Sequence, residues 1–189
     1  PLPRPAAAQR INILSVGSLL ECKGFEYLVE ACGILKEKGV DFHCTIAGGG
    51  PLEASLRRQA AASGLEDVVA FTGFITQDKL IPLYHAADIF VLPMVPEIHW
   101  GIPNVLIEAM AASVPVVCTL LPSVPELIED GKTGFFVPPK DPAAISDMII
   151  RLQADGVLRE RTAVAGRDIV EKKFDAAKNS KQLMDLFVN

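Results

Sequence analysis

The sequence predicts an α/β domain: a doubly wound parallel sheet of about six strands with helices on both faces. From residue 11 onward, short runs rich in β-branched and aromatic residues alternate with longer stretches of helical periodicity, as expected of βαβ units. The strand-like runs are almost continuously apolar, which is typical of strands in a sheet covered on both faces. With 189 residues, the chain is long enough to bury one sizeable core.

Helices are predicted between and after the strands, and two of them have residues typical of helix ends. Apolar residues recur at spacings of three and four over 25–39, and Gly39 would close that helix. The helix over 51–64 would have Pro51 in its first turn and Gly64 beyond its end. The remaining predicted helices are 77–87, with Pro82 as a local irregularity, 104–113, and three after the last strand, near 141–154, 157–173 and 175–187.

Each predicted strand is a short apolar run bounded by turn-forming residues. The runs are INILSVG (11–17), DFHCTIAG (41–48), VVAFTG (68–73), DIFVLP (88–93), VPVVCT (114–119) and TGFFVPP (133–139). Parallel sheets of this kind bind ligands at the carboxyl ends of their strands, near the switch in strand order. The residues that follow each strand are therefore the candidate site.

The segment before the first strand, PLPRPAAAQR (1–10), is rich in proline and lacks the apolar stretch of a signal peptide. We interpret it as a linker from a domain that precedes this one. The predicted domain then covers 11–189, with the C-terminal helices at about 141–189. The longest apolar stretches are strand-sized, so no transmembrane span is expected.

The composition argues against several classes of protein. The net charge is −5 and no basic run occurs, whereas nucleic-acid-binding domains usually carry a basic stripe. The four cysteines lack the CxxC spacing of a zinc site. They are expected to be reduced, buried thiols of a cytosolic protein, and the expected location is the cytoplasm. The cysteines are Cys22, Cys32, Cys44 and Cys118.

The loops after the first two strands are rich in glycine. In GSLLECKGF (17–25), Gly17 gives the turn after the strand its conformational freedom. Lys23 lies beside the N-terminus of the next helix, where a phosphate could be bound. The alternative for Lys23 is a solvated loop lysine. In AGGGPLEA (47–54), the G-x-G-x-x-G dinucleotide spacing fails because residue 53 is Glu. Those three glycines suit either close approach to a ligand or a tight turn without one.

The loop after the third strand gives a weaker indication of ligand binding, and the loop after the fourth strand gives a stronger one. Residues 73–75 could present backbone groups to a planar ring or form only a turn. The loop 93–103 leads into a helix that starts at Asn104 or at the Pro103 step. Glu108 lies off the apolar face of that helix. It could accept hydrogen bonds from vicinal hydroxyls such as those of a ribose, or it could be a surface residue that favours the helix dipole.

Five motifs occur in an order that resembles one enzyme family. They are VGSLLECKGFEYLVEA, IAGGGPLEASL, FTGFITQDKLIPLYHAADIFVLP, GIPNVLIEAMAASVPVV and SVPELIEDGKTGFFVPPKD. Together they resemble the C-terminal domain of retaining glycosyltransferases with the GT-B fold, over nearly all of 11–175. The resemblance implies one Rossmann-like half of a GT-B fold. The GIPNVLIEAMA variant is similar to that of bacterial surface-polysaccharide enzymes.

The resemblance implies roles for individual residues. Glu108 matches the glutamate that holds the ribose hydroxyls of the donor, and Lys23 matches the lysine that neutralises its diphosphate. Phe74 and Ile75 match the segment that packs against the base. Backbone at Gly101 and Ile102 would touch the donor sugar or phosphates. The other positions assigned to donor binding are Gly17, Ser18, Gly73, Pro103 and Asn104.

The sequence departs from the family pattern at two places. The family motif GRLxxxKG pairs an arginine with the lysine, and here Ser18 occupies the arginine position. One of the two cationic side chains that would contact the donor phosphates is therefore absent. The family commonly spaces two glutamates by seven residues, whereas ten separate Glu97 from Glu108. Glu97 is carried over with Lys23 as a catalytic residue that reaches the sugar. His99 and Trp100, in the same loop, are assigned either to packing or to the sugar.

The resemblance implies hexosyl transfer from a nucleoside diphosphate sugar to an acceptor hydroxyl, in polysaccharide or glycoconjugate synthesis. No cofactor or obligate metal is expected, since no DxD-like motif follows a strand. A preceding N-terminal domain would bind the acceptor and could contact a membrane peripherally, so this domain alone would bind donor without turnover. Two alternatives remain: a non-catalytic α/β binding or regulatory module that has lost donor binding, and a nicotinamide-dependent oxidoreductase.

Overall fold

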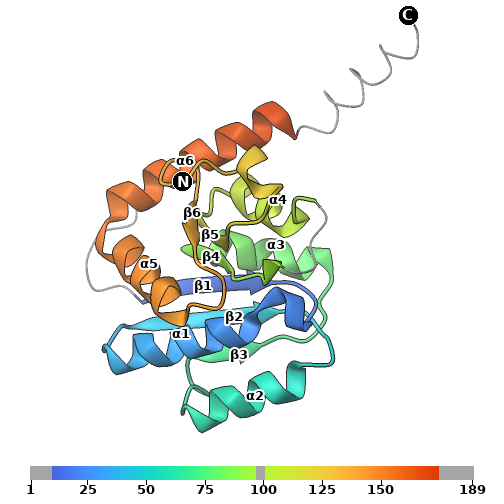
Figure 1. Cartoon of the computed structure of the whole chain (residues 1–189), viewed down its shortest axis with the longest axis vertical. Coiled ribbons are helices and arrows are strands. Elements are labelled where there is room, and N and C mark those ends of the chain that lie inside the picture. The colour runs from blue at the N-terminus through green and yellow to red at the C-terminus, as the bar shows by residue number, and fades with distance from the viewer. Residues whose placement is uncertain (1–9, 97–100, 175–189) are drawn as a thin grey trace, which may run out of the picture.

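Six parallel strands form one sheet in the order β3-β2-β1-β4-β5-β6 (Figure 1). The computed structural model describes residues 10–96 and 101–174. The strands are β1 (Ile11–Val16), β2 (Phe42–Ala47), β3 (Val69–Phe71), β4 (Ile89–Leu92), β5 (Val116–Thr119) and β6 (Phe135–Val137). The predicted sheet is confirmed, and every predicted strand is present, shortened by one to four residues.

Helices cover both faces of the sheet, as the apolar strands predict (Figure 1). One apolar cluster joins the sheet to α1, α2 and α5, and a second joins the opposite face to α3, α4 and α6. Neighbouring strand residues alternate between the clusters: Ile13 faces the first and Leu14 the second. The helices are α1 (Phe25–Glu37), α2 (Glu53–Ala62), α3 (Gln77–Ala86), α4 (Asn104–Ala111), α5 (Pro142–Ala154) and α6 (Gly156–Lys173).

The helix ends follow the predicted glycines, with one correction. Gly39 and Gly64 lie just past α1 and α2 with φ of 71° and 63°, the left-handed conformation that glycine adopts readily. Pro51 was predicted in the first turn of α2, and this is wrong, because the helix begins at Glu53. The N–H of Leu52 donates to the carbonyl of Leu19 at 3.2 Å, so the preceding turn is held against another loop.

The strand order reverses between β1 and β4. Strand β1 pairs with β2 on one side and with β4 on the other. The chain therefore leaves the carboxyl ends of these two central strands in opposite directions, towards α1 on one face and α4 on the other. This reversal creates the crevice in which open α/β sheets bind ligands.

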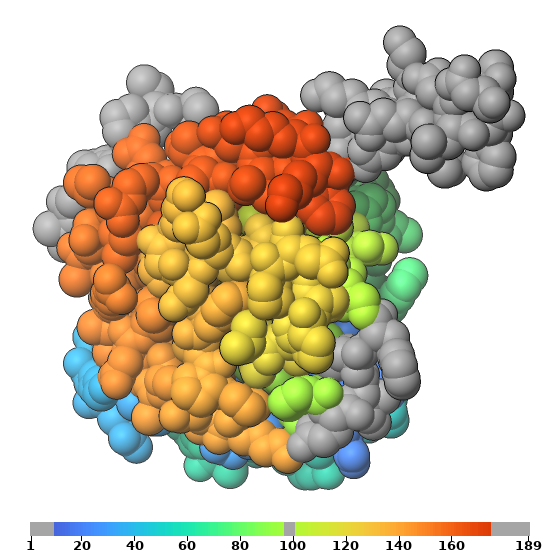
Figure 2. Space-filling model, turned by 45° about the horizontal axis from the view of Figure 1, so that its top comes forward, coloured from blue at the N-terminus to red at the C-terminus, as the bar shows by residue number. Residues whose placement is uncertain are grey.

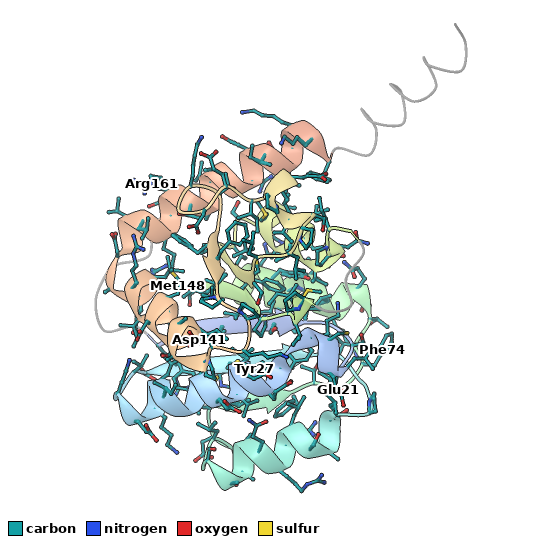
Figure 3. The ribbon with its side chains drawn as sticks, in the orientation of Figure 1. Glu21, Tyr27, Phe74, Asp141, Met148 and Arg161 are labelled. Carbon is teal, nitrogen blue, oxygen red and sulfur yellow. The ribbon has the colours of Figure 1, made fainter. Side chains whose placement is uncertain are left out.

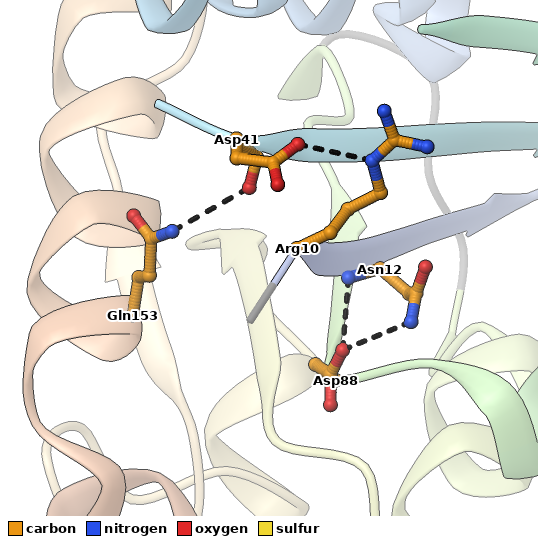
Figure 4. Close-up of polar contacts among 5 residues, drawn as sticks. All are labelled: Arg10, Asn12, Asp41, Asp88 and Gln153. Atoms are coloured by element: carbon orange, nitrogen blue, oxygen red, sulfur yellow. Dashed lines mark hydrogen bonds and ion pairs between the residues drawn. The ribbon is translucent and has the colours of Figure 1, made fainter. Parts of the chain in front are cut away.

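Polar contacts hold the opposite, amino edge of the sheet (Figure 4). Asp88, just before β4, accepts hydrogen bonds from the Asn12 backbone at 2.8 Å and from its side-chain amide at 3.2 Å. Arg10 pairs with Asp41 at 3.0 Å, and Gln153 of α5 donates to the Asp41 carbonyl at 3.5 Å. Polar side chains thus join β1, β2, β4 and α5 at this edge, away from the carboxyl ends.

The two C-terminal helices pack on opposite faces of the sheet, α5 beside α1 and α6 beside α4. Asp141 and Asp155 cap α5 and α6 by accepting from backbone N–H groups at 2.9 and 2.8 Å. Helix α6 packs on α4, and Lys173 donates to the carbonyl of Glu126 in the β5–β6 connection at 3.1 Å. Figure 2 shows this connection in yellow beside α6 in red. The predicted third helix, 175–187, lies outside the described residues.

The cysteines are free thiols, as predicted. Cys32, Cys44 and Cys118 are buried, whereas Cys22 is half-buried. Within residues 10–96 and 101–174, no helix combines the length and the apolar character needed to cross a membrane.

Candidate functional site

The loop after β1 holds Lys23 over the end of its own strand. Lys23 ends a short 3₁₀ helix, Glu21–Lys23, that precedes α1. A Cβ placed on Gly17 would lie 3.8 Å from both Cδ and Cε of Lys23, so the lysine stem lies against the first residue after β1. In the part of the chain that the structure describes, no carboxylate forms an ion pair with its ammonium. Lys23 is half-buried with its stem against the end of β1, and whether its ammonium holds a phosphate or is solvated stays open.

The loops that leave the two central strands touch through Gly24. This residue has φ of 65°, and a Cβ on it would lie 2.0 Å from the carbonyl oxygen of Pro93, just past β4. Beside this contact, the N–H of Val95 donates to the carbonyl of Cys22 at 3.0 Å. Only glycine permits both the conformation and the approach. The residue next to Lys23 is thereby fixed against the end of β4.

The three glycines after β2 join three loops backbone to backbone. A Cβ on Gly48, which has φ of 143°, would lie 1.9 Å from the carbonyl oxygen of Gly17, and one on Gly50 would lie 2.6 Å from that of Leu19. The N–H of Gly48 donates to the carbonyl of Gly73 at 3.0 Å. The structure shows a tight turn, and whether these glycines also approach a ligand stays a prediction. Its glycines let the loops after β1, β2 and β3 meet closely.

An exposed aromatic side chain stands at the end of β3. Phe74 is 83% exposed, although it directly follows Gly73, which is bonded into the glycine loop. Ile75 is half-buried and packs against the core of the second face. Figure 3 labels Phe74 and Glu21 on the same side of the molecule, where β1 and β3 end. The predicted base-packing segment therefore offers one free ring surface and one anchored side chain.

Helix α4 begins at Asn104 without a side-chain cap. Pro103 occupies the N-cap position and Asn104 is exposed, and neither side chain bonds the first turn. Ile102 packs against the core of the second face, while Gly101 is exposed with φ of 103°. The uncapped first turn leaves backbone N–H groups and the positive end of the dipole for another acceptor. The other predicted residues of this loop, Glu97, His99 and Trp100, lie outside the described residues.

Glu108 is half-buried and has a partner that sequence reasoning missed. Its Oε2 accepts a hydrogen bond of 2.8 Å from the hydroxyl of Tyr84 in α3. Tyr84 is only 3% exposed, and its ring packs near that of Phe90 at 5.9 Å between centroids. Glu108 is therefore tied to the buried face of α3 rather than fully solvated, and its role at a ribose stays a prediction. The sequence feature that could have revealed this partner is a tyrosine at an apolar position of α3, because a buried tyrosine hydroxyl usually has a hydrogen-bond partner.

A separate cavity of about 540 Å³ lies behind the Lys23 loop, between α1 and α2. Its lining includes Glu21, Glu26, Gln59 and Lys140, but neither Lys23 nor Glu108. One carboxylate oxygen of Glu26, Oε2, is buried with no hydrogen-bond partner. Burial, reinforced by the charges of Glu30 and Glu21, raises the pKa of Glu26 above its usual value. Cys22 and Val95, from the loops after β1 and β4, also line this cavity, so it adjoins the carboxyl-end site from the side of α1 and α2.

Metal binding remains a matter of expectation. Among the described side chains, no group of three or more His, Cys, Asp or Glu is placed to hold a metal ion. The expectation of chemistry without an obligate metal stays a prediction, as do the roles of all the site residues.

Comparison with known proteins assigns the family. The model of glycosyl transferases group 1 matches residues 10–155. The chain is 38% identical over 186 residues to the amylovoran biosynthesis glycosyltransferase AmsK of Erwinia amylovora, covering 97% of this chain and 46% of the relative. It is 37% identical over 190 residues to the putative colanic acid biosynthesis glycosyltransferase WcaL of Escherichia coli, covering 98% of this chain and 47% of the relative. The chain thus spans about half the length of these relatives.

Solved structures agree with this assignment. The C-terminal domain of the group 1 family protein LpcC from Francisella tularensis has a TM-score of 0.76 and 30% identity, covering 88% of this chain and 87% of that one. HepE of Anabaena, solved with UDP and glucose, has a TM-score of 0.83 over 95% of this chain and 48% of its own. At 23% identity, the second similarity shows the fold alone. The fold is that of one half of a GT-B enzyme, and the chain belongs to the group 1 glycosyltransferase family.

Proposed function

We propose that this chain is the donor-binding half of a retaining glycosyltransferase. It would bind a nucleoside diphosphate sugar whose hexosyl group is transferred to an acceptor hydroxyl in polysaccharide or glycoconjugate synthesis. One observation carries the proposal: Lys23 and the uncapped N-terminus of α4 follow the two strands on either side of the switch point. The names of AmsK and WcaL, both polysaccharide enzymes, support the biosynthetic context.

The leaving diphosphate is the group that most needs stabilisation in this reaction. Lys23 supplies a cation, and the first turn of α4 supplies backbone N–H groups and a positive dipole end. Fixed donors aimed at developing negative charge lower the barrier to departure of the diphosphate. We assign this work to Lys23 and the first turn of α4, and an obligate metal is not part of the proposal.

The other donor groups have separate partners. Glu108 accepts hydrogen bonds from the ribose hydroxyls, since an ionised carboxylate is an acceptor only. Phe74 and Ile75 pack against the base, with the exposed ring of Phe74 available for stacking. Glu97, which lies outside the described residues, is assigned to the sugar by family resemblance alone.

The acceptor site belongs in this proposal to an N-terminal domain of the same protein. A chain that spans 46–47% of its relatives supports a two-domain enzyme of which this is one half. The other half would carry any peripheral membrane contact, and the enzyme would work in the cytoplasm. This domain alone would bind donor without catalysing transfer.

The test is isothermal titration of the 189-residue chain with UDP, GDP, ADP and NAD. We expect saturable binding of one nucleoside diphosphate that is weakened at least tenfold by Lys23→Met, because a hydrogen bond to a charged group contributes about 1.5–3 kcal/mol. Lys38→Met is the matched control. It removes the same charge at the far end of α1, where Lys38 forms only an exposed ion pair with Asp147.

Two outcomes would contradict the proposal. Saturable binding of NAD alone would favour the oxidoreductase. No binding of any nucleotide, by this chain or by the full-length protein, would favour the non-catalytic module. The module has one observation in its favour, because Ser18 is exposed and uncharged at the position where the family resemblance implies an arginine.

A further inference from the structure

The hydrogen bond between Tyr84 and Glu108 links the core of the domain to the donor site. We propose that Tyr84 is a positioning residue: its hydroxyl holds Oε2 of Glu108 so that Oε1 is presented to the ribose hydroxyls of the nucleotide. This inference rests on the proposed function, because it assumes that Glu108 binds the ribose. It assigns to α3 a part in donor recognition through α4, without direct contact with the donor.

The anchoring of Tyr84 makes it suited to this role. Only 3% of the residue is exposed, and its ring packs with Phe90 of β4 and the core of the second face. The hydroxyl therefore has little freedom. From this fixed point it reaches the carboxylate of Glu108, in the second turn of α4, at 2.8 Å.

The direction of this hydrogen bond is also fixed. Burial, together with the hydrogen bond and the negative charge of Glu108, raises the pKa of Tyr84 far above its usual value. The hydroxyl stays protonated throughout the physiological range, so it donates and the carboxylate accepts. No group in the described part of the chain donates to Oε1. One oxygen is thus held, and the other remains as an acceptor for a diol.

Holding one oxygen lowers the cost of binding. A glutamate side chain has three rotatable bonds, and ordering them on binding opposes affinity. With Oε2 held by Tyr84, much of that ordering occurs on folding rather than on binding. A purely structural role is the competing explanation, in which the hydrogen bond only ties α3 to α4 and contributes nothing specific to ribose recognition.

The two explanations differ in their response to removing the ribose hydroxyls. Tyr84→Phe removes the donor oxygen and retains the ring that packs on Phe90. We would titrate wild type and variant with the nucleoside diphosphate that wild type binds (UDP, GDP or ADP) and with its 2′,3′-dideoxy analogue, the deoxynucleotide, which lacks both hydroxyls of the diol. If Tyr84 positions Glu108, the variant should bind the ribonucleotide about 3–10-fold more weakly, whereas its affinity for the deoxynucleotide should change less than twofold.

A double-mutant cycle and a matched control complete the test. In a Glu108→Gln background, adding Tyr84→Phe should cause little further loss, because the two residues act as a unit. Tyr27→Phe removes the same atom from the other tyrosine, which lies in α1 beside the separate cavity, and should leave both affinities unchanged. Unfolding temperatures of all variants report whether the fold is intact.

The outcomes separate this inference from the proposed function. Equal losses for the ribo- and deoxynucleotide, or a lowered unfolding temperature with unchanged affinities, would overturn the positioning role and leave the donor-site proposal standing. If neither this chain nor the full-length protein binds UDP, GDP or ADP, the proposed function and the role of Tyr84 fall together. If Tyr84→Phe lowers affinity for the ribonucleotide alone, and has no further effect in the Glu108→Gln background, both the proposed function and the positioning role are supported.

Discussion

Replacing Gly24 by alanine tests whether the crevice is built by close contact between the loops of β1 and β4. The new Cβ would lie 2.0 Å from the carbonyl oxygen of Pro93, whereas real contacts of this kind are essentially never shorter than 3.0 Å. One loop must therefore move by about 1 Å. Overpacking of this kind costs about 1–3 kcal/mol, in addition to the strain of a left-handed alanine.

Two other glycines separate these costs. Gly39 has a similar φ, 71°, but a Cβ on it would meet nothing within 4 Å, so Gly39→Ala should cost about 1 kcal/mol from backbone strain alone. Gly33 lies inside α1, where a Cβ also meets nothing, and Gly33→Ala should stabilise by about 0.5–1 kcal/mol. Gly24→Ala should then destabilise by about 2–4 kcal/mol.

The assay is urea unfolding of the four proteins, analysed by linear extrapolation, with unchanged m-values required for the comparison. The order of stability should be Gly33→Ala, wild type, Gly39→Ala, Gly24→Ala. If Gly24→Ala lowers the free energy of unfolding no more than Gly39→Ala does, the Pro93 carbonyl can move aside without loss of stability. The contact between Gly24 and Pro93 would then not hold the crevice together.

Three further substitutions test individual site residues and the separate cavity. Ser18→Arg should tighten nucleoside diphosphate binding by about 2–10-fold in a titration, because it restores a second phosphate cation; unchanged affinity would show that the site does not use this position. Phe74→Ala should weaken nucleotide binding by about 2–10-fold through lost stacking, yet leave the unfolding free energy within about 0.5 kcal/mol, since the side chain is 83% exposed. A large loss of stability would refute that account of Phe74. Glu26→Gln should raise the unfolding temperature near pH 8, because folding raises the pKa of this acid and so disfavours its charged form. The gain should disappear below the ordinary pKa of 4.5, where the acid is protonated in both states; a gain independent of pH would show that charge is not the cause.

The sequence was sufficient for the fold because the local signals agree with one another. Apolar runs separated by helical periodicity predict every strand, and glycines at 39 and 64 mark two helix ends. Errors occur where a distant loop decides the local geometry. Pro51 precedes α2 because the adjoining residue, Leu52, donates to the carbonyl of Leu19, and this contact between separate loops leaves no local pattern.

The site was predicted less completely for the same reason. Glycines after β1 and β2 predict turns, but their spacing does not reveal that Gly24 meets Pro93 or that Gly48 meets Gly17. Tyr84 and Glu108 lie on different helices, and no periodicity pairs them. Residue type alone showed that Glu108 was unusual in an apolar helix, whereas its partner required the packing of α3 beside α4.

These contacts make stability and donor binding interdependent. The residue next to Lys23 is held by the end of β4, and Glu108 is held by a tyrosine buried under the same sheet. Both predicted donor contacts therefore depend on the second apolar cluster and the loops above it, rather than on flexible surface side chains. A preorganised site of this kind spends less binding energy on ordering its own groups. The residues that determine affinity should accordingly include Gly24 and Tyr84, neither of which is expected to touch the nucleotide.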